Sequence, residues 1–193
     1  FNRNTVLCGN VIVSGQRKDS PDPRRFVYFG SDLPAAESTG HNGGLFLFHN
    51  TLVAGSGDVL FIELADARAR LLAENNIFYG SDNVLAAGES KALDGRTNLF
   101  AATARVPEQL RASVKGDPRF VDVGKRDYRL TDGSPAIDAG VTGSRYTDGS
   151  GSSHLFVPDK SPWRGMKESP RKVNARPDIG AYEKGAQPAT QAD

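Results

Sequence analysis

The stretch that decides the fold is Asn50-Thr51-Leu52-Val53-Ala54-Gly55, in which an Asn precedes two apolar residues and a Gly closes the phrase. The same pattern occurs at Asn10-Val11-Ile12-Val13-Ser14-Gly15 and at Asn75-Asn76-Ile77-Phe78-Tyr79-Gly80. A weaker copy without the Gly is Thr97-Asn98-Leu99-Phe100-Ala101-Ala102. A phrase that returns every 20 to 40 residues or so is typical of repeat proteins, in which each repeat stacks on its neighbour.

Each residue type in the phrase has a physical role. The Asn side chains are expected to stack about 4.8 Å apart and to bond to one another as a ladder. Without the ladder, a buried unpaired amide would cost roughly 1–3 kcal/mol. The expected ladder consists of Asn10, Asn50 and Asn75. The Gly residues permit a bend with positive φ, and the expected bends lie at Gly15, Gly55 and Gly80.

Short apolar runs fill the intervals between the copies and are too short and too rich in β-forming residues to be helices. Nearly continuous apolar runs of this kind are expected of parallel strands. The predicted strands are residues 26–29, 45–48, 59–64, 70–73, 84–87 and 93–94. Two insertions rich in Pro, Gly, Ser and charge, at 16–25 and 31–44, lengthen the first interval.

These repeats resemble the right-handed parallel β-helix, the solenoid shared by pectate lyases, pectin lyases and many secreted bacterial proteins. A second resemblance covers the C-terminal part of the chain, which is similar to the end of secreted bacterial β-helix proteins of the "choice-of-anchor Q" type. It rests on four phrases: Asp117-Pro118-Arg119-Phe120-Val121-Asp122, Asp127-Tyr128-Arg129-Leu130, Gly133-Ser134-Pro135-Ala136-Ile137-Asp138-Ala139-Gly140 and Asp178-Ile179-Gly180-Ala181-Tyr182-Glu183. Together the two resemblances span about residues 5–183 and imply an all-β fold; the chain departs from the second one at 141–175.

The repeats place β-helix coils at 1–102 and a C-terminal coil and capping region at 103–183, with a long loop at 141–175 and a flexible tail at 184–193. Apolar spacing predicts a helix within 105–114 that covers the last coil. Short strands are predicted at 120–121, 128–130 and 136–137. The chain opens just before Asn10 with nothing to cap the first coil, so we expect either missing N-terminal coils or a capping partner at that edge.

Composition excludes several classes of function. The net charge is +1, from 24 basic and 23 acidic residues, which does not suggest nucleic-acid binding. No apolar run approaches the roughly 20 residues of a membrane span. The single Cys8 cannot form an internal disulfide and is expected to face inward beside Phe48 and Ala73. No zinc spacing, phosphate loop or nucleophile triad is present.

The resemblance implies a polysaccharide ligand bound on an outer sheet face, with Lys or Arg as base, Ca²⁺ to neutralise a uronate, and no organic cofactor. Residues just before the ladder Asn should point outward, because side chains alternate along a strand. This places His49, Glu74 and Arg96 in one outward column, which could bind or deprotonate a uronic sugar. The alternative is a solvated column of ion pairs, each worth about 0.2–1 kcal/mol.

Two further sets of residues could contact a glycan. The first insertion brings together the cations Arg17, Lys18, Arg24 and Arg25, which could line a groove for an acidic polysaccharide or form a solvated loop. Trp163 could offer a stacking platform for a sugar, or could pin the long loop to the body of the protein.

The sequence thus predicts the C-terminal part of a secreted, polysaccharide-active β-helix protein, either a polysaccharide lyase or a glycoside hydrolase, with much of the active site outside this chain. The alternative is a non-catalytic extracellular or cell-surface solenoid that binds glycans or is purely structural. Fold-level analogy carries this prediction, and a fold does not dictate a function.

Overall fold

The computed structural model describes residues 4–14, 25–30, 43–55, 58–87, 92–147, 150–156, 160–161, 169–173 and 176–185. The chain is all-β, and its main part is built from short parallel strands. These are β1 (Thr5–Cys8), β2 (Val11–Val13), β3 (Arg25–Phe29), β4 (Gly44–Phe48), β5 (Thr51–Val53), β6 (Leu60–Leu64), β7 (Arg70–Glu74), β8 (Ile77–Tyr79), β9 (Leu85–Ala86), β10 (Ala92–Phe100) and β11 (Ala112–Lys115).

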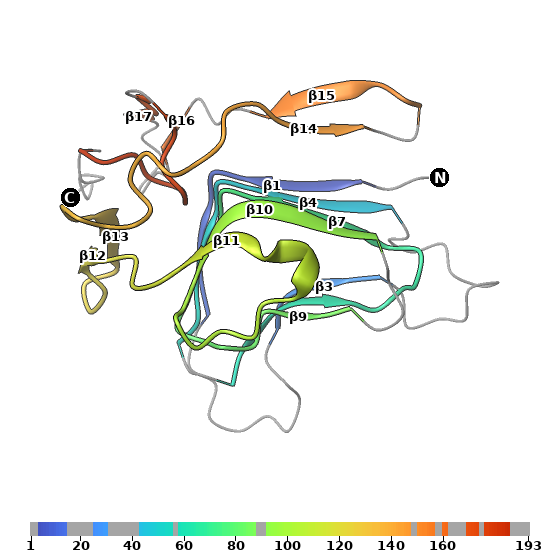
Figure 1. Cartoon of the computed structure of the whole chain (residues 1–193), viewed down its shortest axis with the longest axis horizontal. Helices are drawn as coiled ribbons and strands as arrows, with labels where there is room; N and C mark the ends of the chain where they lie inside the picture. Colours follow the sequence, from blue (N-terminus) through green and yellow to red (C-terminus); the bar gives the residue numbers. More distant parts are fainter. Residues whose placement is uncertain are drawn as a thin grey trace, which may run out of the picture.

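The strands form three parallel columns that the chain visits in turn. β1, β4, β7 and β10 pair in register in the first column, and β2, β5, β8 and the end of β10 pair in the second. β3, β6 and β9 form a separate three-stranded sheet. Figure 1 looks along this stack, with β1, β4, β7 and β10 on one side and β3 and β9 on the opposite side. The predicted parallel strands are confirmed: the ends of five of them differ from the prediction by at most one residue, and the sixth, predicted at 93–94, is the longer β10.

The core lies between the columns and consists of side chains at alternate strand positions. Leu45 and Leu47 of β4 are fully buried in it. Three Phe rings from β6, β8 and β10 contact one another in series at its centre: Phe61 and Phe78 pack edge-to-face with ring centroids 5.3 Å apart, and Phe78 and Phe100 stack with centroids 4.9 Å apart. Burying each such side chain contributes about 1.5–3 kcal/mol, so the rings hold successive turns of the chain together.

An Asn ladder runs through the stack, and its members are Asn10, Asn50, Asn76 and Asn98. Asn10 donates to Asn50 Oδ1 from its backbone N–H (3.1 Å) and its Nδ2 (3.0 Å). Asn50 donates to Asn76 Oδ1 in the same way, at 2.9 Å from each nitrogen, and Asn76 donates to Asn98 Oδ1 at 3.0 and 2.9 Å. The predicted ladder is confirmed in kind, but its third member is Asn76 rather than Asn75, and Asn98 extends it.

The bend of each turn lies at the residue before the ladder Asn. Gly9, His49, Asn75 and Thr97 all have positive φ, between 53° and 70°. This left-handed conformation is unusual for β-branched Thr97, and the repeated turn imposes it. The predicted bend at Gly80 is present, with φ of 90° and its Cα against the Ala54 carbonyl. Gly55 does not have a positive φ, so the bend expected there is wrong. Gly15 lies outside the described residues.

The last turn is closed by a strand and not by the predicted helix. Residues 105–114 form a one-turn 3₁₀ helix, η1 (Glu108–Leu110), followed by β11, which pairs with β10. Ser113 Oγ accepts the Asn98 N–H at 3.2 Å and so ends the ladder. Leu110 is fully buried over Gly95, where a Cβ would lie 2.6 Å from Leu110 Cδ2. Burying Leu110 and continuing the sheet outweigh the helical spacing of the apolar residues.

The C-terminal part folds back on the stack. β12 (Phe120–Asp122) and β13 (Asp127–Leu130) form an antiparallel pair, as do β14 (Ser144–Thr147) with β15 (Ser153–Phe156) and β16 (Lys160–Ser161) with β17 (Ser169–Pro170). Strands at 120–121 and 128–130 are confirmed, whereas residues 136–137 form a turn. In Figure 1 the β14–β15 hairpin lies outside β1 and β4.

This hairpin explains why β4 is apolar on both faces. Leu45 and Leu47 face the core, while Phe46 and Phe48 lie on the outer face and are nevertheless buried. The ring centroids of Phe46 and Tyr146 are 4.2 Å apart, so the hairpin covers that face. In the part of the chain that the structure describes, the helical structure is limited to η1, and no helix there has the length and apolar character of a membrane span.

Candidate functional site

The predicted outward column is divided between two positions of the stack. Glu74 lies opposite Phe48 and Arg96 in the strand register, and Arg96 Nε donates to Glu74 Oε1 at 2.9 Å. His49 belongs to the next position, beside Asn75. The expected shared face of His49, Glu74 and Arg96 is therefore wrong by one residue, because the ladder Asn of this turn is Asn76. The catalytic role of the three residues stays a prediction.

The His49 side chain is buried, and its imidazole is neutral. Its Nε2 lies 2.9 Å from Asn75 Nδ2, and its Nδ1 lies 3.2 Å from Arg171 Nη2. Burial, helped by the Arg171 charge, lowers the pKa of His49 to about 3. Both neighbours are N–H donors, so an imidazolium would face donors on both sides. A neutral imidazole accepts at one ring nitrogen and carries an N–H on the other, so His49 accepts a hydrogen bond from one of these two neighbours, and its side chain is buried.

Arg171 is the centre of the buried polar cluster around His49. It forms an ion pair with Glu183 and donates to the carbonyls of Gly180 (3.1 Å), Ala181 (2.9 Å) and Asp178 (3.2 Å). Burial lowers the pKa of Arg171 and raises those of Asp178 and Glu183. This cluster ties the C-terminal segment to the stack.

The predicted glycan-binding cations and platform are only partly described. Arg17, Lys18, Arg24 and Trp163 lie outside the described residues. Arg25 begins β3, forms an ion pair with Glu63 of β6, and places its guanidinium carbon 5.4 Å from the centre of the Tyr28 ring. Its charge is therefore already matched by a carboxylate on the neighbouring strand. Cys8 lies in register with Phe48 as predicted, but its next neighbour in the column is Glu74 rather than Ala73, and it shares the outer face with Phe48 instead of facing inward.

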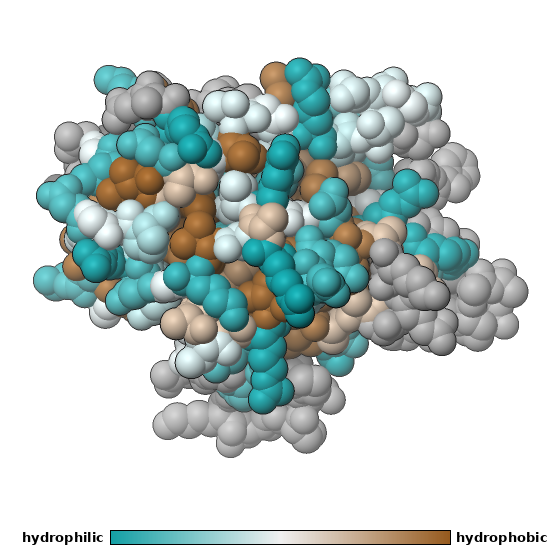
Figure 2. All heavy atoms as spheres, viewed as in Figure 1, coloured by the Kyte–Doolittle hydropathy of each residue, from teal (hydrophilic) through white to brown (hydrophobic). Residues whose placement is uncertain are grey.

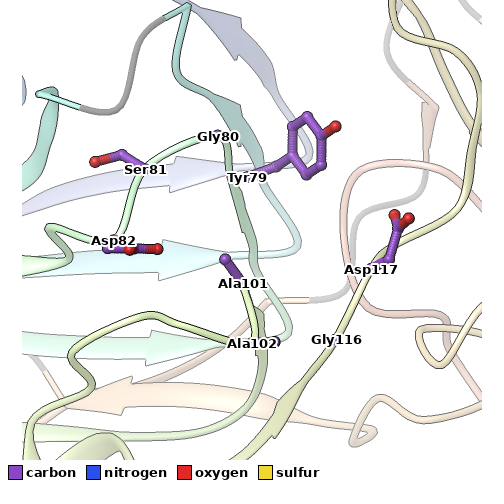
Figure 3. Close-up of a pocket in the computed structure, with 8 residues that line it drawn as sticks. All are labelled: Tyr79, Gly80, Ser81, Asp82, Ala101, Ala102, Gly116 and Asp117. Atoms are coloured by element: carbon purple, nitrogen blue, oxygen red, sulfur yellow. The ribbon is translucent and has the colours of Figure 1, made fainter.

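A groove that the sequence did not predict lies on the outer face, where the second column ends. It has a volume of about 390 Å³, and the segments after β8, β10 and β11 line it. Its lining consists of Tyr79, Gly80, Ser81, Asp82, Ala101, Ala102, Gly116 and Asp117. In Figure 3 the Tyr79 ring and the Asp117 carboxylate extend from different segments toward the same opening, and Asp82 lies on the other side of Ala101. We call this the Tyr79 groove.

Local bonds hold the polar groups of the Tyr79 groove. Asp82 accepts a hydrogen bond from Thr103 Oγ1 at 2.6 Å, and Asp117 accepts the Arg119 N–H at 2.8 Å. Ser81 points inward, where its Oγ donates to the Val59 carbonyl at 2.6 Å. The Tyr79 ring packs edge-on against Phe120, with centroids 5.3 Å apart. The groove thus offers one half-buried aromatic ring and two positioned carboxylates.

Sequence reasoning missed this groove because its residues are dispersed. Tyr79 was part of the repeat phrase, Asp82 followed it in a turn, and Asp117 belonged to the C-terminal phrase. Their one common signal is that each stands at or just after the end of a strand, and parallel strands of one column end at the same edge.

The described residues were also compared with the needs of a metal ion. Within the described ranges, no three His, Cys, Asp or Glu side chains gather as metal ligands would. Asp82 and Asp117 are the carboxylates that line the Tyr79 groove.

Comparison of this chain with family models, with curated proteins and with solved structures finds no match.

Proposed function

We propose that this chain is part of a right-handed parallel β-helix in a secreted or cell-surface protein, and that the Tyr79 groove binds a polysaccharide. Three parallel columns, an internal Asn ladder and stacked Phe rings support the β-helix. The choice-of-anchor Q resemblance of the C-terminal phrases remains part of the proposal.

The observation that carries the proposal is that one aromatic ring and two carboxylates line the same open groove. A sugar ring presents apolar C–H faces, which pack on aromatic rings, and hydroxyl groups, which donate hydrogen bonds. Ionised carboxylates accept such bonds about twice as strongly as neutral acceptors do. Tyr79 supplies the ring, and Asp82 and Asp117 supply the acceptors. The two negative charges favour a neutral glycan over a polyuronate unless a cation such as Ca²⁺ is present.

The two carboxylates also favour a second candidate, hydrolysis of the bound glycan. Glycoside hydrolases use two carboxyl groups about 5–5.5 Å apart when they retain the anomeric configuration, and about 6.5–9.5 Å apart when they invert it. Asp82 and Asp117 come from different segments that border one groove. An active site completed by residues outside this chain is compatible with this arrangement.

The exposed end of the Asn ladder supports the proposal of further coils or a capping partner. Asn50, Asn76 and Asn98 each accept two hydrogen bonds at Oδ1 from the preceding ladder Asn. Asn10 is the first member and is exposed, and among the described residues no donor to its Oδ1 is recorded. A further coil with an Asn in the same place would supply both donors.

The test of glycan binding is affinity electrophoresis of the protein in gels that contain xyloglucan, mixed-linkage β-glucan, galactomannan or polygalacturonate. We expect at least one neutral glycan to retard the protein, and Tyr79→Leu or Asp117→Asn to weaken that binding about tenfold. Tyr28→Leu is the matched control, because Tyr28 is an exposed Tyr on β3, in the other sheet. Binding that is absent, or equal in all variants, would refute the proposal.

Asp117→Asn, together with Asp82→Asn, separates binding from hydrolysis. Hydrolysis predicts that the unmodified protein releases reducing ends from the bound glycan. Both Asp82→Asn and Asp117→Asn should lose this release, while at least one of them is still retarded in the gel. Retardation without release of reducing ends would establish a binding module.

A further inference from the structure

A second hollow lies at the end of the stack, next to η1 and β11. It has a volume of about 510 Å³, within the range of ligand pockets. Its lining consists of Phe100, Ala104, Arg105, Val106, Arg111, Ser113 and Lys115. This end of the stack faces the viewer in Figure 1, and Figure 2 shows hydrophilic side chains gathered with apolar ones on that face. We call it the end hollow.

All charged residues that line the end hollow are cations. Arg105, Arg111 and Lys115 contribute three positive charges, whereas the whole chain has a net charge of +1. The carboxylate of Glu108 lies 3.7 Å from Arg111 Nη1. Both side chains of that pair are more than two-thirds exposed, so water screens their attraction. A hollow lined by one sign of charge concentrates the field and attracts anions.

The cations keep hydrogen-bond donors for a ligand. Lys115 Nζ donates once, to the Ala104 carbonyl at 2.9 Å, which fixes the ammonium at the rim and leaves two donors. The Arg111 contact with Glu108, at 3.7 Å, is too long for a hydrogen bond. Ser113 Oγ accepts the Asn98 N–H, so its hydroxyl hydrogen can be donated elsewhere.

We propose that the end hollow binds an anionic group of the phosphate or sulfate class. Two guanidinium groups and an ammonium suit a tetrahedral oxyanion, because Arg binds two oxygens side by side and Lys adds a point charge. Phe100 and Val106 give the hollow an apolar wall for the uncharged remainder of the ligand. The proposal is independent of the Tyr79 groove, whose charged lining is acidic.

The test is isothermal titration at low ionic strength with inorganic phosphate, inorganic sulfate, glucose 6-phosphate and glucose 6-sulfate. We expect an anion to bind, and the binding to weaken as salt is added. Arg105→Gln or Arg111→Gln should weaken the binding about tenfold, and Lys115→Gln should have a similar effect. Stronger binding of the sugar esters than of the free ions would identify an esterified saccharide. Equal binding would identify the free ion as the ligand.

The controls are Lys125→Gln and Arg126→Gln, exposed cations of the β12–β13 turn that do not line the end hollow. Both variants should bind phosphate as the unmodified protein does. Asp117→Asn, a variant of the Tyr79 groove, should also bind phosphate normally. Unchanged thermal unfolding would show that each variant is folded. The proposal is overturned if no anion binds, or if the control cations matter as much as Arg105 and Arg111.

Discussion

Asn75 and Val141, which are 66 positions apart, exchange two hydrogen bonds: Asn75 Nδ2 donates to the Val141 carbonyl, and the Val141 N–H donates to Asn75 Oδ1, both at 2.9 Å. Asn75 Oδ1 also accepts Thr97 Oγ1 at 2.7 Å, and the Asn75 carbonyl accepts the Gly180 N–H at 2.7 Å. One amide on the bend therefore attaches the C-terminal part of the chain to the outside of the stack.

Replacement of Asn75 by Ala should loosen this attachment without dissolving the stack. The variant leaves the Val141 N–H and carbonyl without their partner, which costs about 1–3 kcal/mol for each buried group. Hydrogen exchange should accelerate in residues 136–147 and 178–184 and remain slow in β4, β5 and β7. Equal acceleration throughout the chain would show that the C-terminal part and the stack unfold as one unit.

Replacement of Asn76 by Ala should destabilise the stack itself. Asn76 Oδ1 accepts both donors of Asn50, and its Nδ2 donates to the Leu47 carbonyl (2.8 Å), the Glu74 carbonyl (3.0 Å) and Asn98. We expect a loss of about 3 kcal/mol or more in the free energy of unfolding, measured in urea.

The matched control is Asn10→Ala, because Asn10 is an exposed end of the same ladder. Its loss should be about 1 kcal/mol. Similar losses at the two positions would contradict the interpretation that buried amides carry the ladder.

The buried imidazole of His49 predicts that stability decreases on acidification. The pKa of His49 is about 3 in the folded protein and 6.5 in the unfolded chain. As the pH falls below 6.5, His49 is therefore protonated in the unfolded chain but not in the folded protein. The stability from this residue is complete above pH 6.5 and decreases by about 2 kcal/mol by pH 5. Urea unfolding of the unmodified protein and of His49→Gln at pH 7 and pH 5 would measure it.

Two carboxyl groups of the same cluster act in the opposite direction. Burial raises the pKa of Asp178 and Glu183, so the folded protein binds their protons more readily than the unfolded chain does. Protonation of these two groups therefore starts at a higher pH in the folded protein than in the unfolded chain, and it stabilises the folded state as the pH falls. His49→Gln should therefore lose less stability than the unmodified protein between pH 7 and 5. An identical pH dependence in both proteins would contradict the role given to His49.

Removal of one partner of the buried Arg171–Glu183 pair should be costly. Arg171→Met leaves the Glu183 carboxylate and three backbone carbonyls without their donor, and we expect a loss of about 3–5 kcal/mol. The double variant with Glu183→Leu should recover part of that loss, because it removes the unpaired buried charge. Chemical denaturation of both variants measures the difference, and a double variant that is worse than the single one would refute this account.

The all-β class and the parallel strands could be read from the chain, because each repeat carries its own pattern. Residues 45–48 form a short, continuous apolar run, as a buried parallel strand does, and the recurring Asn predicts a ladder. The error at Asn75 has a simple cause. Gly80 stands five residues after Asn75, as the phrase requires, so the spacing favoured Asn75, whereas the ladder is decided by hydrogen bonds of Asn76 to Asn50 and Asn98, which lie on other strands.

The sites depended on contacts that no local pattern encodes. His49 was expected at the surface, but Arg171, 122 positions away, and the segment around Asp178 bury it. Tyr79, Asp82 and Asp117 line one groove because the ends of β8 and β11 lie at one edge of the stack.

By itself, then, the sequence determined the strands, their parallel stacking and the existence of an amide ladder, since these depend on alternation and repetition within short stretches. The tertiary structure alone decided which Asn joins the ladder, which face of β4 the C-terminal hairpin covers, and where the Tyr79 groove and the end hollow open. The physical reason is that hydrogen-bond pairing, burial and local charge are properties of neighbours in space, and here those neighbours are 20 to more than 120 residues apart along the chain.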